Sequence, residues 1–273
     1  MAANGEPQPT PGSERALAVA LAREAGSVLL EHVARGVTAE WKGGTDPVSA
    51  ADRAAEELIR ERIAAALPGD VVVGEEGEEV PEASVRGRRR WYVDPLDGTT
   101  NFLKGRPRWA VSIAFCDADD RLAAAAIHLP STGELYDAGR DAGAAQDGEP
   151  LRCGTTATLD EALVALGALT RGRPDQAVAA GLAGQVLSLR VTGSGAADLA
   201  DVAAGRADAF VTTGSGRWDI AAGALLAAEA GAAVTTLTGE DALGPSETVV
   251  AATPALHPAL LELVTHASRS GEG

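Results

Sequence analysis

Hydrophobic residues near the start of the chain recur at helical spacing in two segments. The first segment runs from residue 13 to residue 36, and the second begins near residues 49–52 and stops at Pro68. Their apolar stripes consist of Leu17, Leu21, Val28, Leu29 and Val33, and of Leu58, Ile59 and Ile63. Because a serine opens the first stripe and a glycine or proline ends each one, both segments are predicted to be helices.

Short apolar runs follow, and each predicts a β-strand. In the middle of the chain these runs are residues 71–73, 91–93, 110–116, 122–129 and 135–136, whereas 78–89 is charged and predicted to be irregular. The later runs are 164–169, 187–191, 209–212, 233–237 and 249–252, and they alternate with helical patterns at 175–184, 196–204, 219–230 and 256–267. Alternation of strands and helices favours a layered α/β architecture.

The chain divides into a tail and two subdomains. Residues 1–12 are polar and proline-rich, which predicts a disordered tail. The stretch 137–150 is rich in glycine, aspartate and alanine, and we place the subdomain boundary within it. Residues 13–145 would form an N-terminal α+β subdomain with most of the candidate metal ligands. Residues 146–273 would form a C-terminal α/β subdomain that completes the site.

The net charge and composition of the chain limit the kinds of molecule that it could bind. A net charge of −16 at pH 7 disfavours a nucleic-acid polymer or an anionic membrane. An acidic protein that binds a small phosphorylated molecule would need bound cations, although the same surplus of charge also serves solubility alone. No stretch approaches the roughly 20 apolar residues of a membrane span. The N-terminus has no signal-peptide pattern, and the two cysteines form no CxxC motif, so a cytoplasmic protein is expected.

Residues 91–102, Trp-Tyr-Val-Asp-Pro-Leu-Asp-Gly-Thr-Thr-Asn-Phe, carry the most specific chemistry. Asp94 and Asp97 lie three residues apart at the end of an apolar run, and Gly98 and Thr99 follow at once. Strand ends are where layered α/β proteins place ligand-binding groups. Carboxylate oxygens bind hard cations, and the N–H groups that open a helix bind phosphate. The segment therefore predicts metal ligands beside a phosphate pocket.

Two further carboxylates could join this site. Glu75 follows another predicted strand, and Asp219 follows Trp218 at the start of a predicted helix. Acidic groups that converge without arginine partners repel one another unless cations lie between them. Mg²⁺ is the expected ion, because the candidate ligands are all oxygens and the four histidines are scattered. Taken singly, Asp-Gly-Thr is a common turn, Gly-Glu-Glu a common acidic loop, and Asp219 could cap a helix.

Together these motifs resemble the inositol monophosphatase family of lithium-sensitive, Mg²⁺-dependent phosphatases. The resemblance covers residues 14–253 and is carried, in the family's order, by Gly74-Glu75-Glu76, residues 91–102, Val111-Ser112-Ile113-Ala114 and Trp218-Asp219-Ile220-Ala221-Ala222-Gly223. It implies a layered α-β-α-β-α sandwich of the inositol monophosphatase and fructose-1,6-bisphosphatase type, with an α+β part followed by an α/β part. It also implies a homodimer.

The resemblance implies that two or three Mg²⁺ ions bind in the cleft between the two parts. Their ligands would be Glu75, Asp94, the Leu96 carbonyl, Asp97 and Asp219. Asp94 would bridge the two tighter sites. Lys42, in a loop with two glycines, matches a family lysine near the third metal and can also be interpreted as a solvated loop charge.

Catalytic roles are implied for Asp52, Glu75 and Thr99. Thr99 and Asp52 would orient the water that attacks phosphorus, and a bound metal would lower the pKa of that water. The backbone N–H groups of Gly98 and Thr99 would hold the phosphate. The residues expected beside the substrate are Asp97, Gly98, Thr99, Gly193, Ser194, Gly195, Thr212 and Asp219.

Thr212 departs from the family pattern. Seven residues before Asp219, inositol-cleaving members carry a glutamate that binds ring hydroxyls, and loss of that charge-assisted hydrogen bond would cost roughly 1.5–3 kcal/mol. We therefore expect hydrolysis of a small-molecule phosphate monoester with an altered leaving-group pocket. A nucleoside monophosphate, a 3′-phosphoadenosine-type bisphosphate and histidinol phosphate are alternative substrates. A non-catalytic scaffold protein is the alternative from another class.

Overall fold

The computed structural model describes residues 12–36, 39–42, 46–76, 80–167, 175–244 and 246–270, with side chains throughout except at 39–42, 46–49, 175 and 270. The predicted disordered tail lies outside these residues, apart from Gly12. The helices are α1 (Ser13–Arg35), α2 (Ala50–Ala66), α3 (Glu82–Val85), α4 (Thr99–Leu103), α5 (Asp175–Leu182), α6 (Gly195–Ala203), α7 (Arg217–Glu229) and α8 (His257–Ser270), with a 3₁₀ turn at Leu159–Glu161. None of the described helices is long and apolar enough to cross a membrane.

The strands form a small hairpin and two larger sheets. The hairpin pairs β1 (Ala39–Lys42) with β2 (Asp46–Ser49). The first large sheet contains β3 (Val71–Gly74), β4 (Arg90–Asp97), β5 (Ala110–Cys116), β6 (Leu122–Leu129), β7 (Glu134–Gly139), β8 (Gly143–Gln146) and β9 (Glu149–Pro150), in that order. The second contains β10 (Leu163–Leu166), β11 (Ser188–Arg190), β12 (Ala209–Thr212), β13 (Ala233–Thr235) and β14 (Val249–Ala252), in the order β11-β10-β12-β14-β13.

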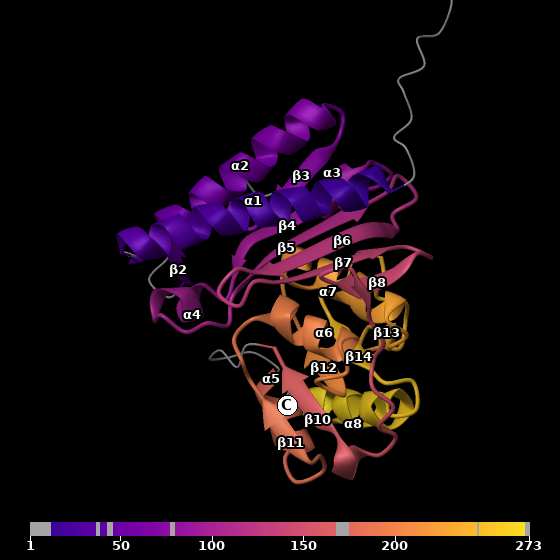
Figure 1. The fold of residues 1–273 in the computed structure, drawn as a ribbon. Helices are drawn as coiled ribbons and strands as arrows, with labels where there is room; N and C mark the ends of the chain where they lie inside the picture. The colour runs from indigo at the N-terminus through magenta and orange to yellow at the C-terminus, as the bar shows by residue number, and fades with distance from the viewer. Residues whose placement is uncertain are drawn as a thin grey trace, which may run out of the picture.

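The first large sheet is covered on both faces, because alternate residues of a strand point to opposite sides. In β5, Ile113 and Phe115 pack in one cluster with buried residues of α1 and α2. Ala114 and Cys116 point the other way and pack in a second cluster with residues of α6 and α7. Every residue of β5 is therefore buried because the strand lies between two layers of helices (Figure 1).

The second sheet lies between α6 and α7 on one face and α5 and α8 on the other (Figure 1). Phe210 of β12 packs with Leu199 of α6, whereas Val211 packs with Val178 of α5 and Leu260 of α8. Helices α6 and α7 are thus shared between the two sheets. The resulting order of layers is helix, sheet, helix, sheet, helix, and the predicted α-β-α-β-α sandwich is confirmed.

The structure adds elements that the hydrophobic pattern does not indicate. A short helix, α3, lies within the charged segment 78–89. Strands β8 and β9 extend the first sheet to Pro150, so the boundary that we place at residue 145 falls within β8. The chain passes from the first sheet to the second between Pro150 and Leu163.

Candidate metal centre

Four of the predicted ligands come from elements that meet at one edge of the first sheet. Because β3 and β4 are parallel, their carboxyl ends lie together, and the Glu75 N–H donates to the Val93 carbonyl at 3.3 Å. The pairing of β4 with β5 shifts register between Asp94 and Asp97, and such irregularities redirect side chains at strand ends. Asp219 reaches the same place from the first turn of α7.

Three of these carboxylates form a compact group. Glu75, Asp94 and Asp219 each offer an oxygen, and these oxygens all lie within 4.8 Å of one another. Asp94 is fully buried, and its Oδ1 accepts a hydrogen bond from the Leu96 N–H at 2.8 Å. Oδ2 of Asp219 accepts from the Gly216 N–H at 3.1 Å, which fixes this side chain against the start of its own helix. The carboxylates of Asp94 and Asp219 are therefore held in place by nearby backbone N–H groups.

The electrostatics of the group favour a cation. Burial, and after it the charge of the Asp219 carboxylate, raise the pKa of Glu75 to about 8. Burial and the Glu75 charge raise the pKa of Asp94 well above its ordinary value. No arginine or lysine among the described residues neutralises Glu75 or Asp94. A divalent ion would supply the missing positive charge and lower both pKa values, and an all-oxygen donor set suits Mg²⁺.

Asp97 lies near the group, but its carboxylate is engaged elsewhere. Oδ2 of Asp97 accepts hydrogen bonds from the Ser194 hydroxyl and the Ala196 N–H, both at 2.7 Å. Burial raises the pKa of Asp97 to about 6, and the hydrogen bond from Ser194 opposes that shift. The charge of Asp97 still raises the pKa of Glu75 and of Asp94, so the side chain is within electrostatic reach of both. Asp97 thus ties the end of β4 to the start of α6.

The residues predicted to orient the attacking water also lie together. The Thr99 hydroxyl donates to the Leu96 carbonyl at 3.1 Å and approaches Oδ1 of Asp52 at 3.4 Å. Asp52 is buried in the first turn of α2, which places its carboxylate beside the start of α4. The Leu96 carbonyl, a predicted metal ligand, is therefore in contact with the Thr99 side chain.

Gly98 has a backbone conformation that would be strained if any other residue stood at this position. Its φ is +94°, and a Cβ there would lie 3.0 Å from the Arg108 carbonyl oxygen and 3.1 Å from that of Gly193. The Asn101 amide donates to the Arg108 carbonyl at 2.6 Å and to the Thr192 carbonyl at 2.9 Å. These contacts hold residues 98–101 against residues 192–195. The first segment includes Gly98 and Thr99, which are predicted to hold the phosphate, and the second includes Gly193–Gly195, which are predicted to lie beside the substrate. Asn101 received no role from the sequence.

Thr212 is fully buried at the end of β12. Its hydroxyl lies 3.0 Å from the Ser215 hydroxyl, and a Cβ at Gly167 would lie 2.6 Å from the same oxygen. Thr212 exposes no surface to a ligand, and its assignment to the leaving-group pocket stays a prediction. The side chain of Lys42 lies outside the described residues.

Arg108 connects the two halves of the molecule near Asp97, and the sequence analysis did not identify it. Its guanidinium donates to the Ala197 carbonyl at 3.0 Å and forms ion pairs with Asp198 at 3.0 Å and Asp201 at 2.5 Å. Asp198 is 2% exposed, and burial raises its pKa to about 7 although Arg108 opposes the shift. The sequence does show an aspartate, Asp198, among the apolar residues at the start of a predicted helix. It does not indicate that Arg108, 90 residues away, is the partner of this aspartate.

Comparison with known proteins gives a consistent result. The sequence profile of the inositol monophosphatase family matches residues 13–269. The chain is 41% identical over 215 residues to an inositol-1-monophosphatase of Rhizobium meliloti, covering 77% of each protein. It is 37% identical over 251 residues to a Salmonella typhimurium protein named Nus factor SuhB, covering 90% of this chain and 93% of that one. The solved structure of the extragenic suppressor protein suhB from Bartonella henselae superposes with a TM-score of 0.82 and 33% identity, over 91% of this chain and 97% of that chain.

Proposed function

The chain belongs to the inositol monophosphatase family, and from this membership we propose that it is a Mg²⁺-dependent phosphatase acting on a small-molecule phosphate monoester. The observation that carries the proposal is the group formed by Glu75, Asp94 and Asp219, whose oxygens lie within 4.8 Å of one another. Such a group is destabilised by mutual repulsion unless it binds protons or cations. A role in binding a metal explains why the fold retains it.

Glu75, Asp94 and Asp219 would hold the ions, with the Leu96 carbonyl and Asp97 completing the set of ligands. When bound, Mg²⁺ lowers the pKa of a coordinated water and stabilises negative charge on phosphate oxygens. The hydrogen bonds from Ser194 and Ala196 both go to Oδ2 of Asp97, so Oδ1 would be its ligand atom. Asp97 would then connect the ions to the start of α6.

The remaining residues would position the reacting atoms. The Thr99 hydroxyl and the buried Asp52 carboxylate would accept hydrogen bonds from the attacking water and remove its proton. The N–H groups of Gly98 and Thr99 would bind the phosphate, since the positive φ of Gly98 brings the backbone close without a Cβ in the way. Ser194 and Gly195 would lie beside the substrate because Asp97 holds the start of α6 in place. Water would displace the leaving alcohol directly at phosphorus.

The test is phosphate release from p-nitrophenyl phosphate, a generic aryl phosphate, with Mg²⁺ and with EDTA. We expect activity that depends on Mg²⁺, is lost in Asp94→Asn, and is retained in Glu61→Gln, an exposed charge change on α2. A panel of cyclitol, sugar, nucleotide and histidinol phosphates would then identify the leaving group. A clear preference for inositol 1-phosphate would contradict the altered pocket that we infer from Thr212. Failure of the folded protein to release phosphate at any Mg²⁺ concentration would overturn the proposed activity.

A second candidate function is a non-catalytic scaffold. The observation that favours it is the name Nus factor SuhB, carried by a relative that is 37% identical across most of both chains. Against it, the acidic side chains expected at the metals and at the water are all present in this chain: Asp52, Glu75, Asp94, Asp97 and Asp219. The same aryl phosphate assay separates the two functions, because a scaffold would fold normally and release no phosphate.

A further inference from the structure

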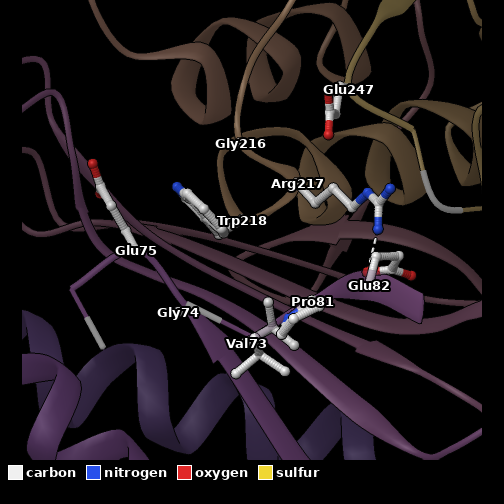
Figure 2. Close-up of a pocket in the computed structure, with 10 residues that line it drawn as sticks. Val73, Gly74, Glu75, Pro81, Glu82, Gly216, Arg217, Trp218 and Glu247 are labelled. Atoms are coloured by element: carbon white, nitrogen blue, oxygen red, sulfur yellow. Dashed lines mark ion pairs between the residues drawn. The ribbon is translucent and has the colours of Figure 1, made fainter. Parts of the chain in front are cut away.

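The turn that carries Glu75 has one side open to a pocket and one side packed against the protein. Figure 2 shows Glu75 immediately beyond Gly74 at the end of β3, with its carboxylate directed away from Val73. Gly74 and Glu75 line a pocket of about 370 Å³, which they share with Trp218 of α7. Because this side of the turn faces an open pocket, the contacts that fix its backbone have to come from the other side.

Glu56 of α2 supplies such a contact, and it is buried, with 3% of its surface exposed. Its Oε2 accepts a hydrogen bond from the Glu76 N–H at 2.8 Å, and its Oε1 accepts one from Nε of Arg60 at 2.6 Å. Arg60 also donates to the Val72 carbonyl at 3.1 Å. Glu56 and Arg60 together therefore contact the backbone on both sides of Gly74.

Gly74 leaves the space that Glu56 needs. A Cβ at Gly74 would lie 2.6 Å from Oε1 of Glu56 and 2.8 Å from a terminal nitrogen of Arg60, so any larger residue would displace both side chains. The φ of Gly74 is not in the left-handed region. The close approach of Glu56, rather than a special backbone conformation, therefore accounts for a glycine at this position.

Stability alone is a poor explanation for a buried glutamate on α2. Apart from Asp52, the other buried side chains of this helix are apolar: Ala51, Ala55, Ile59 and Ile63. A buried ion pair is often no more stabilising than apolar side chains of the same volume, so the pair with Arg60 does not by itself require a carboxylate. An apolar side chain could not accept the hydrogen bond from Glu76. That hydrogen bond is the property that an apolar replacement would lack.

The same helix also carries Asp52, one turn before Glu56. Residues four apart on a helix share a face. Oδ1 of Asp52 lies 3.4 Å from the Thr99 hydroxyl, just beyond the end of β4, whereas Glu56 contacts the turn after β3. A single turn of α2 therefore contacts the segments that follow two neighbouring strands. It fixes the carboxylate proposed to act on water relative to the turn that carries a proposed metal ligand.

We propose that Glu56 is a positioning residue of the metal centre, which holds the turn after β3 through the Glu76 N–H so that the Glu75 carboxylate faces Asp94 and Asp219. The proposal rests on the Mg²⁺-dependent function proposed above. Without this hydrogen bond the turn would adopt other orientations, and metal binding would have to select one of them. Residues that orient a ligand in this way typically contribute about tenfold to a hundredfold to metal affinity.

The binding test uses Mn²⁺ in place of Mg²⁺, because oxygen ligands suit both ions and electron paramagnetic resonance measures free Mn²⁺ directly. Metal-free protein is titrated without substrate. Glu56→Met and Glu56→Gln both remove the charge, but only glutamine keeps an oxygen that can accept from the Glu76 N–H. We expect Mn²⁺ to bind Glu56→Met about tenfold more weakly than Glu56→Gln. Glu57→Gln, an exposed charge change at the next position of α2, is the matched control and should bind as the wild type does.

Gly74→Ala disturbs the same hydrogen bond without changing Glu56. Its methyl group would displace the Glu56 carboxylate, so we expect Mn²⁺ affinity to fall about tenfold. Gly69→Ala, before the other end of β3, is the matched control, because a Cβ there would meet no atom within 4 Å. Circular dichroism in EDTA shows which variants are folded, and Gly74→Ala decides the question if Glu56→Met does not fold.

Activity gives a second readout. The Mg²⁺ concentration that half-activates phosphate release from p-nitrophenyl phosphate should rise in Glu56→Met and in Gly74→Ala, and should not change in either control. A purely structural role for Glu56 would lower the free energy of unfolding and leave this concentration and the Mn²⁺ affinity of the folded variants as they are in the wild type.

The outcomes separate the positioning role from the phosphatase function. Equal Mn²⁺ affinities for Glu56→Met and Glu56→Gln would overturn the positioning role, even in an enzyme that releases phosphate with Mg²⁺, because the charge or nothing at all would then matter. Mn²⁺ affinity that depends on the Glu56 acceptor, in a protein that releases no phosphate, would support the positioning role and refute the phosphatase. A wild type that binds no Mn²⁺ would overturn both.

Discussion

Removing one negative charge from the carboxylate group should stabilise the metal-free protein. Burial and neighbouring carboxylates raise the pKa of Glu75 from 4.5 to about 8, so folding favours the protonated side chain. At pH 7 the unfolded chain ionises Glu75 freely, whereas the folded protein must keep a proton on it or bear repulsion. At 1.36 kcal/mol per pKa unit, this difference costs the folded state at most about 3 kcal/mol at pH 7. Glu75→Gln, which cannot ionise, should recover most of that free energy of unfolding.

The sign of the pH dependence follows from the raised pKa. Below about pH 4.5 both the folded and the unfolded states are protonated at Glu75, and the penalty is absent. As the pH rises toward about 8, the unfolded chain releases its proton more readily than the folded protein, so the wild type loses stability. The advantage of Glu75→Gln should therefore be below about 1 kcal/mol at pH 5 and close to its full value at pH 7.

Guanidinium chloride unfolding in EDTA at pH 5 and pH 7 measures this difference. We expect the midpoint of the variant to exceed that of the wild type at pH 7 with an unchanged m value. Adding Mg²⁺ should stabilise the wild type more than the variant, because the ion binds the folded state only. Glu61→Gln serves as the control for an exposed charge. Equal midpoints for wild type and Glu75→Gln at pH 7, or the same gap at both pH values, would refute the reasoning.

Four further outcomes test other parts of the structure. Asp94→Asn should abolish turnover while the metal-free protein stays folded, as followed by phosphate release and circular dichroism; retained turnover would refute its proposed role. Gly98→Ala should lower the free energy of unfolding by about 1–3 kcal/mol, because its positive φ and close carbonyls strain an alanine; an unchanged unfolding midpoint would contradict this. Arg108→Met should cost about 2–3 kcal/mol by leaving buried Asp198 without its cation, and chemical denaturation would show no loss if the ion pair were unimportant. Burial raises the pKa of Cys116 to about 12, so a thiol reagent at pH 8 should label it only after unfolding; rapid labelling of both thiols in the native protein would be the contrary result.

The layers of the fold could be predicted where the local pattern was strong. Strands β5 and β6 match the predicted runs 110–116 and 122–129, because strands buried between two helical layers are almost continuously apolar. The helix α3 has only four residues and one buried side chain, Val85, so it leaves no periodic signal. Strand β8 has the sequence Gly-Ala-Ala-Gln and owes its place to pairing with β7, which a local pattern does not record.

The candidate site was also predictable only where a local sequence pattern indicated it. Asp94 could be selected because carboxylates at a strand end are visible in sequence, and the resemblance to a family supplied the distant Asp219. The hydrogen bonds that Asp97 accepts from Ser194 and Ala196 join residues more than ninety positions apart, and no local motif indicates them. Glu247 belongs to a connection without any recognisable motif, and it lines a pocket beside Glu75 with residues of β3 and α7 that are distant from one another in sequence.

The sharing of α6 and α7 between the two sheets has a consequence for synthesis. These helices cover the second apolar face of the first sheet, yet they lie in the last third of the chain, and Asp219 is carried by the later of them. While the ribosome is still translating, that face has emerged and its cover has not. The nascent chain must therefore hold the sheet in a loose or chaperone-protected state until the C-terminal helices appear. The proposed metal site would therefore be complete only after translation has passed residue 219.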